Sequence, residues 1–252
     1  MMKILPLMLF PILAFCGSIE YVPIIEIHPS QLRYSQDNVN EKQQWAMTKG
    51  YAKWDPATEK YKLSFAEGHS SLPETEALPV VRAPFGLALT DGHHEVLSSL
   101  ALGADLIPVK IIADLSALSE EEFWNEMEKK GWAYPYAIGG NRVTPPIDFA
   151  LLKNDPNRYF AAISARKFPK GIHSESFGAE YPLWIKVGKD IPFIEFMIAD
   201  VLWKKGIIYD TTKWGRNPPD EFVEEARALL LETNIPGLHI VPVKQHYQEI
   251  DL

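Results

Sequence analysis

The sequence predicts an α/β protein of the α+β type, followed by a mainly helical extension toward the C-terminus. Up to about residue 118, short apolar runs typical of strands alternate with helix-like segments. After that point the periodic segments have helical spacing. The 252 residues, 46% of them hydrophobic, suffice for one core with an accessory lobe or for two small domains.

The first half of the chain supplies the predicted strands. Apolar runs favour strands, and polar stretches broken by Pro and Gly favour loops. In chain order we expect a strand at 21–27, a surface helix at 40–51, a long loop or irregular hairpin at 54–75, strands on both sides of Ala83–Pro84, a helix after Gly92 and a strand at 107–112.

The second half supplies helices. Ser119 and Glu122 form a capping-box pattern, which predicts a helix over 120–130 that ends at Gly131. Asn217–Pro218 is typical of a helix start. Further helices are expected at 147–152, 192–205 and 219–231, and a Lys/Gly/Ser-rich loop at 167–178 is expected to form a mobile flap.

The N-terminus has the pattern of a signal peptide. Lys3 precedes the apolar stretch 4–15, which is shorter than the roughly 20 residues that span a bilayer. Ala14 and Cys16 stand at the −3 and −1 positions before Gly17. The alternatives are a lipid anchor on Cys16 and a buried N-terminal strand, and we favour simple cleavage.

Export and the domain division follow from this pattern. We expect a signal peptide at 1–16, a core at 17–118 and a mainly helical extension at 119–252 packed on that core. The mature protein is then periplasmic or secreted, with no transmembrane segment. The single cysteine lies in the signal, so the mature chain has no disulfide and no thiol chemistry.

The charge balance limits the partners. The formal net charge is −8, whereas a broad non-specific grip on DNA needs a basic face. We therefore expect no strong basic DNA-binding surface, although a local basic cleft stays open.

The most informative motif is Asp91-Gly92-His93-His94, between an apolar strand and a helix. The apolar spacing of Val96, Leu97 and Leu100 predicts that helix. A helix start offers unpaired backbone N–H groups and a favourable dipole, which suit an anion such as phosphate. The motif therefore predicts a site for a phosphate-containing small molecule or a nucleic acid.

Three roles are open for the two histidines. His93 is a candidate general acid or base with Asp91 orienting it. A divalent metal is a second option, but no third ligand is in sight, so we assign no metal residues and leave the cofactor open. The imidazoles could instead hold phosphate, with His94 and Gly92 among the contacts. The plainer alternative is a polar turn with solvated histidines.

The motif and its surroundings resemble the ParB/sulfiredoxin superfamily. The resemblance extends over about 24–207 and is most specific for the family labelled "putative ParB-like nuclease". It implies a ParB/sulfiredoxin-like mixed sheet with helices, and phosphate binding at the turn. The matching segments are 24–31, 78–81, 89–109, 113–116, 122–124, 131–136, 154–158 and 192–196.

The motif also differs from better-known branches of this superfamily. Partitioning ParB proteins have Glu-Arg-Arg where this chain has His93, His94 and Glu95, so the resemblance argues against a nucleotide-triphosphate clamp. Sulfiredoxins have cysteine at the position of His93, which excludes sulfinic acid reduction. Free-serine kinases have a stretch similar to Asp91-Gly92-His93.

Candidate residues outside the motif complete the predicted site. Glu26 is a second candidate base, and Gln31 follows the same first strand, beside the turn in this superfamily. Asp114 ends a buried strand, a common place for a ligand contact. Arg142, which follows two glycines, and Arg158 are candidates for the missing phosphate clamp.

Each of these candidates has a structural alternative. Glu26 suits an exposed strand edge, and Asp114 suits a turn cap. Buried carboxylates need partners, so one of Glu195 and Asp200, on an otherwise apolar helix, is expected to pair with an arginine such as Arg158.

The resemblance implies phosphodiester cleavage, so together with the signal-peptide pattern we expect an exported phosphodiesterase or nuclease. In this hypothesis Asp91 and His93 form the acid/base pair, and His94 and Arg142 contact phosphate. One alternative is a catalytically silent envelope or secreted binding module. A second alternative is a phosphotransferase that acts on a small molecule such as an amino acid.

Overall fold

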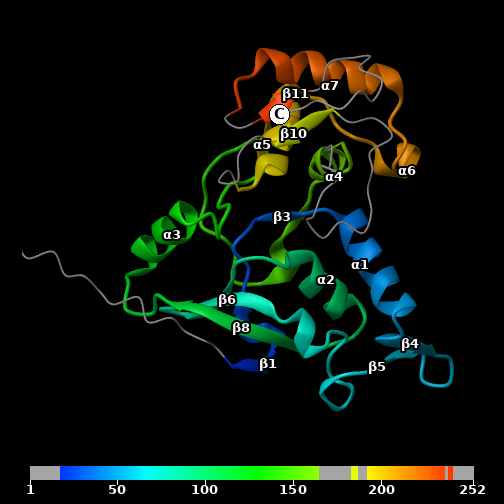
Figure 1. Ribbon diagram of the computed structural model, residues 1–252, viewed down its shortest axis with the longest axis vertical. Helices are drawn as coiled ribbons and strands as arrows, with labels where there is room; N and C mark the ends of the chain where they lie inside the picture. The colour runs from blue at the N-terminus through cyan, green and yellow to red at the C-terminus, as the bar shows by residue number, and fades with distance from the viewer. Residues whose placement is uncertain (1–17, 165–182, 187–191, 236–237, 241–252) are drawn as a thin grey trace, which may run out of the picture.

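The computed structural model of the protein describes residues 18–164, 183–186, 192–235 and 238–240 (Figure 1). The expected signal peptide at 1–16 and the expected flap at 167–178 lie outside the described residues. Within the described part of the chain, no helix is long and apolar enough to cross a membrane.

A mixed five-stranded sheet forms one end of the molecule (Figure 1). Its strand order is β1–β8–β6–β7–β2. The α+β class and the mixed sheet predicted from the sequence are therefore confirmed. The strands are β1 (Ile19–Pro23), β2 (Ile27–His28), β6 (Leu78–Ala83), β7 (Gly86–Leu89) and β8 (Leu106–Asp114).

The strand pairing fixes where the Asp91 turn lies. β6 pairs with β7 antiparallel, and Val80 lies opposite Leu89, the last residue before the turn. β6 pairs with β8 in parallel, and Arg82 lies opposite Asp114. The turn is therefore at the end of the sheet where β6 begins, and Asp114 is at the opposite end.

The helices lie on the sheet and beyond it. In Figure 1, α2 runs alongside the sheet, while α4, α5, α6 and α7 gather at the far end of the molecule. The helices are α1 (Gln36–Thr48), α2 (His93–Ala101), α3 (Glu120–Lys129), α4 (Pro156–Ile163), α5 (Ile194–Lys204), α6 (Thr211–Trp214) and α7 (Asp220–Glu232).

Short strands form small pairs outside the main sheet. The parallel pair of β3 and β9 joins the first part of the chain to the segment that leads into α4. The others are local or lie near the C-terminus. These strands are β3 (Arg33–Tyr34), β4 (Ala52–Asp55), β5 (Lys60–Leu63), β9 (Lys153–Asn154), β10 (Trp184–Lys186) and β11 (Leu238–Ile240).

Local capping explains most boundaries. Helix α1 begins before the expected residue 40 because the Ser35 side chain accepts from the Asn38 N–H and caps it. The predicted capping box of Ser119 and Glu122 starts α3. The helix expected at 147–152 is wrong: only a 3-10 turn at Phe149–Leu151 forms, after which the chain extends into β9.

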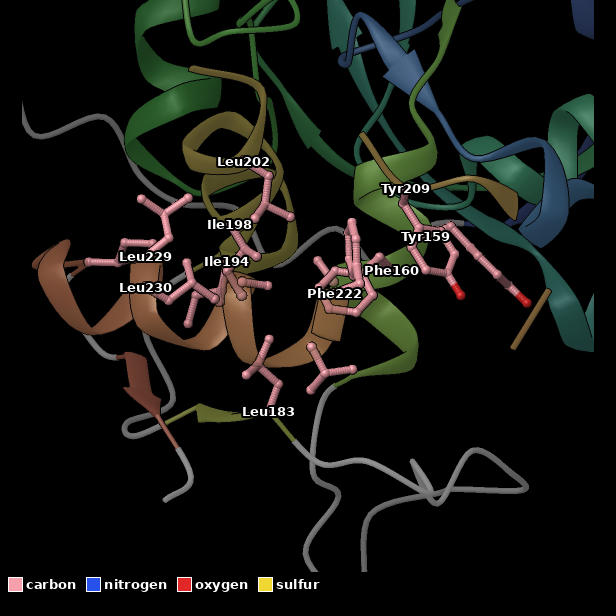
Figure 2. Close-up of a cluster of buried hydrophobic side chains, with 14 residues drawn as sticks. Tyr159, Phe160, Leu183, Ile194, Ile198, Leu202, Tyr209, Phe222, Leu229 and Leu230 are labelled. Carbon is pink, nitrogen blue, oxygen red and sulfur yellow. The ribbon is translucent and has the colours of Figure 1, made fainter. Parts of the chain in front are cut away.

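Two large hydrophobic clusters stabilise the two ends of the molecule. One surrounds the sheet and includes Val80, Leu89 and Ile107. The other lies among α4, α5 and α7 and includes Phe160, Ile198 and Phe222 (Figure 2). β3 passes between these two ends (Figure 1).

Candidate functional site

The turn before α2 depends on Gly92. Its φ is 94°, in the left-handed region, and its N–H donates to the Asp91 Oδ1 at 2.8 Å. A Cβ at this position would lie 2.7 Å from Leu78 Cδ2 on β6. Gly92 therefore lets the chain pass closely over β6 and turn into the helix.

Replacing Gly92 with alanine is expected to lower the free energy of unfolding by about 2–4 kcal/mol, which combines the left-handed backbone cost with overpacking. Gly103→Ala is the matched control, because Gly103 also has positive φ but a Cβ there would meet nothing within 4 Å. Denaturant unfolding checks this prediction. Equal losses in the two variants would contradict the close contact with Leu78.

Both motif histidines are held by backbone N–H groups of the segment before α1. His93 Nε2 accepts from the Ser30 N–H at 3.0 Å, and His94 Nε2 accepts from the Ser35 N–H at 3.1 Å. A backbone N–H can only donate, so each ring carries its proton on Nδ1. The His93 Nδ1 is buried and has no partner among the described residues.

Burial keeps both rings neutral. It lowers the pKa of His93 to about 3, with a further contribution from the positive charge of Arg158. Burial also lowers the pKa of His94 well below its usual value, and Arg158 again adds to the effect. Neither imidazole therefore gains a proton near neutral pH.

The hydrogen bonds separate Asp91 from His93. The Asp91 carboxylate accepts from the Gly92 N–H, and the His93 ring is bound to Ser30. Asp91 itself is exposed, yet reduced hydration raises the pKa of its carboxyl, and the nearby charge of Glu95 adds to this. Asp91 is therefore more basic than an ordinary aspartate, and the two histidines are fixed neutral groups.

The buried histidines predict acid sensitivity. The folded pKa lies below the unfolded one, so the stabilisation is complete above about pH 6.5 and is lost as the pH falls toward 3. For His93 this amounts to at most about 1.4 kcal/mol of unfolding free energy per pH unit in that window.

Urea unfolding between pH 7 and 5 checks this prediction against His93→Gln, whose amide oxygen can still accept from the Ser30 N–H. The variant should lose less stability on acidification than the wild type. If the two curves fall in parallel, His93 is not the buried neutral group described above.

Arg158 brings a positive charge to the motif. It lies in the first turn of α4, and its Nη1 donates to Asn38 Oδ1 at 3.0 Å. Its guanidinium carbon is 4.8 Å from the centroid of the Phe196 ring. Burial lowers the pKa of Arg158, while the negative charges of Glu195, Asp155 and Asp91 oppose this effect.

Part of the hydrogen-bonding capacity of this guanidinium is unused. The Arg158 Nε is buried and has no hydrogen-bond partner among the described residues. The charge of Arg158 contributes to the pKa shifts of Asp91, His93 and His94, so all three lie within its electrostatic range. The structure thus brings together Asp91, Gly92, His93, His94 and Arg158.

The role of Arg33 was not predicted from the sequence. Arg33 is fully buried and pairs with Asp155 and Asp200, each at 2.8 Å. The expectation that a carboxylate of the α5 segment has an arginine partner holds for Asp200, but that partner is Arg33. The sequence shows that Asp200 is an acidic residue on an apolar helix, but it does not show which distant residue pairs with it.

Gln31 lies next to a residue that binds one of the motif histidines, whereas Glu26 lies away from the Asp91 turn. Gln31 is buried, next to Ser30, and bridges the backbone of Tyr134. Glu26 is exposed, and its carbonyl lies near Gly86, the first residue of β7. Glu26 is therefore at the end of β7 away from the turn.

Asp114 and Arg142 make contacts elsewhere. The Asp114 carboxylate accepts from the backbone and hydroxyl of Ser116, as a turn cap does. Arg142 Nε donates to Glu128 at 3.1 Å, and its Nη2 donates to Asn125 at 2.9 Å. These bonds hold Arg142 on α3, outside the group around the motif.

A cleft of about 390 Å³ lies beside α3. Its lining includes Glu120, Glu121, Trp124 and Arg142, and none of the motif residues. Among the described residues, no three His, Cys, Asp or Glu side chains come together as a metal-binding group.

Comparisons with known proteins agree with this fold. The crystal structure of protein Atu1540 from Agrobacterium tumefaciens is similar, with a TM-score of 0.56 and 22% identity. The match covers 85% of this chain and 91% of that one, and at this identity it supports the fold alone. No curated protein matches. A family model described as "Putative ParB-like nuclease" matches residues 20–177, more than half of the chain, and the protein therefore belongs to that family.

Proposed function

We propose that the protein binds a phosphodiester at the start of α2 and hydrolyses it, as a nuclease or phosphodiesterase. The observation that carries this proposal is the Arg158 guanidinium, whose charge acts on Asp91 and both histidines and whose buried Nε has no partner among the described residues. A guanidinium with a free N–H is well suited to a phosphate oxygen.

The start of α2 supports the same ligand. No side chain caps the helix at Gly92, and the first N–H to bond within the helix is that of Val96, to the Gly92 carbonyl. The N–H groups of the first turn therefore remain for an anion, and the helix dipole favours negative charge there. Arg158 and this turn form the proposed phosphate-binding groups.

Asp91 is the proposed general base. Its raised pKa makes the carboxylate a better proton acceptor. In the proposed step, a water molecule transfers a proton to Asp91, and the oxygen of that water attacks phosphorus. The P–O bond to the leaving alcohol breaks, and solvent supplies the proton to that alcohol. Arg158 stabilises the charge on the phosphoryl oxygens during the displacement. His93 and His94 shape the site as neutral groups.

Asp91→Asn tests this mechanism in a hydrolysis assay with bis(4-nitrophenyl) phosphate, with and without Mg²⁺ or Mn²⁺. Loss of the base should lower kcat by about 10²–10⁴-fold with little change in KM. Asp114→Asn is the matched control, because this exposed carboxylate lies at the other end of the sheet. Full activity in Asp91→Asn would rule out this role.

A silent binding module is the second candidate. The observation that favours it is the commitment of both Nε2 atoms to backbone N–H groups, which leaves neither motif histidine able to titrate near pH 7. Binding of a phosphodiester without turnover under every metal condition would identify such a module. Transfer of the terminal phosphoryl group of an added nucleoside triphosphate to added serine, with release of the diphosphate, would identify the phosphotransferase.

We also propose that the protein is exported and that the mature chain begins at Gly17. The support is the signal-peptide pattern of residues 1–16. N-terminal sequencing of protein from the periplasm or medium tests this. An unprocessed chain recovered only from the cytoplasm would overturn it, and lipid on Cys16 would select the anchored form.

A further inference from the structure

Arg33 is the centre of a buried polar network between the two ends of the molecule. Its Nη1 is 2.8 Å from Asp155 Oδ2, and its Nη2 is 2.8 Å from Asp200 Oδ1. The guanidinium also lies over the rings of Tyr134 and Phe196. One side chain from β3 therefore contacts residues that begin α4 and lie within α5.

The Asp155 carboxylate links Arg33 to Arg158. Its Oδ1 accepts from the backbone N–H groups of Asn157 and Arg158, at 3.1 and 3.2 Å, and so caps α4. The same oxygen accepts from Trp203 Nε1 at 2.8 Å, which connects the cap to α5. The oxygen that faces Arg33 and the oxygen that starts the Arg158 helix belong to one rigid group.

The Asp200 carboxylate links Arg33 to the helix that carries Glu195. Its Oδ2 accepts from the Tyr134 hydroxyl at 2.8 Å, and its Oδ1 also accepts from the Gly139 N–H at 3.1 Å. Among the negative charges that raise the pKa of Arg158, that of Glu195, in the first turn of α5, has the largest effect. Arg33 thus fixes the second helix that faces the phosphate-binding guanidinium.

Chain connectivity links Arg33 to the histidines. Arg33 lies between Ser30 and Ser35, whose N–H groups hold His93 and His94. A shift of this short segment would change both contacts. The arginine that fixes α4 and α5 therefore also fixes the segment that orients the two rings.

We propose that Arg33 is a positioning residue for the phosphate site. It holds the segment 30–35, α4 and α5 in one arrangement, so that both imidazoles keep Nε2 bound to backbone and Arg158 stays beside Asp91. Buried ion pairs often stabilise a fold no more than apolar side chains of similar volume would. We therefore assign the Arg33 network the role of fixing the positions of these segments. The phosphate part of this inference rests on the proposed function.

Arg33→Lys tests the inference, because lysine keeps the charge but loses the planar fork that reaches two carboxylates. The readout is long-range ¹⁵N–¹H NMR of the histidine rings in the full chain, which reports the tautomer without any ligand. The wild type should give Nδ1–H tautomers for His93 and His94. In Arg33→Lys at least one of the two should show a mixture of tautomers.

Arg216→Lys is the matched control, because Arg216 pairs with Glu41 at the surface. Its histidine spectrum should equal that of the wild type. Unchanged tautomers in Arg33→Lys would overturn the inference. If Arg33→Lys does not fold, Asp200→Asn takes its place, since asparagine keeps the shape while losing the charge, and the same two outcomes apply.

A double-mutant cycle on binding of a phosphorothioate dinucleotide tests the link to the ligand. Arg33→Lys and Arg158→Lys should each weaken binding at least 10-fold, and the double variant should bind about as weakly as Arg158→Lys alone. If the loss of affinity in the double variant equals the product of the two single losses, the two arginines act independently, and Arg33 does not act by positioning Arg158. If the wild type binds nothing, the proposed function fails, and the NMR result alone decides the role of Arg33.

Discussion

Replacing Arg33 with methionine is expected to lower the free energy of unfolding by about 3–5 kcal/mol. The substitution leaves the Asp155 and Asp200 carboxylates buried without their countercharge. The side chains of Arg33 and Asp155 are fully buried and that of Asp200 is 7% exposed, so water cannot replace the lost partner. Denaturant unfolding at pH 7 measures this loss.

Arg142→Met is the control for that experiment. The Arg142 side chain is 47% exposed and pairs with Glu128, so its loss should cost no more than about 1 kcal/mol. Similar losses for the two arginines would contradict the network around Arg33. A partial recovery of stability when Asp200→Asn is added to Arg33→Met would support it, because a buried charge is then removed.

The second large effect is expected on binding. Arg158→Gln should weaken the affinity for a phosphorothioate dinucleotide at least 100-fold, because the neutral amide loses the charge-assisted bonds to phosphate. Glutamine ends where the Arg158 Nε stands, so it also loses the bond from Nη1 to Asn38. A thermal unfolding curve of the variant establishes that it is folded before binding is compared. Isothermal titration at fixed low salt measures the affinity.

Arg142→Gln provides the comparison, since it removes the same charge from α3, where Glu128 and Asn125 hold the side chain. It should bind the dinucleotide as the wild type does, apart from a small change in the general charge. Equal weakening in both variants would mean that the protein attracts the ligand through overall charge, and would remove Arg158 from the site.

Much of the fold follows from local signals in the sequence. The Ser119 and Glu122 capping box and the strand–Gly92–helix turn are readable because each depends on neighbours in the chain. The family resemblance seen in the sequence extends over about residues 24–207, and the family model matches residues 20–177. The 3-10 turn at Phe149–Leu151 was not predicted, because an apolar run this short does not separate a helix from extended chain.

The site is harder to predict, because its contacts are distant in sequence. Arg33 meets Asp155 and Asp200 across more than a hundred residues, and no local pattern identifies such a partner. The same is true of the Ser30 and Ser35 N–H groups that bind the histidines. The motif indicated the candidate site, but burial and these bonds decide that the rings are neutral.

A crystal structure of the protein with a bound phosphorothioate dinucleotide is the most direct test of the proposed phosphate site. We expect a phosphate oxygen within hydrogen-bond distance of the Arg158 guanidinium and of the N–H groups in the first turn of α2, with Asp91 beside the phosphorus. A dinucleotide bound in the cleft beside α3, with the start of α2 empty, would show that the phosphate site is not at this turn.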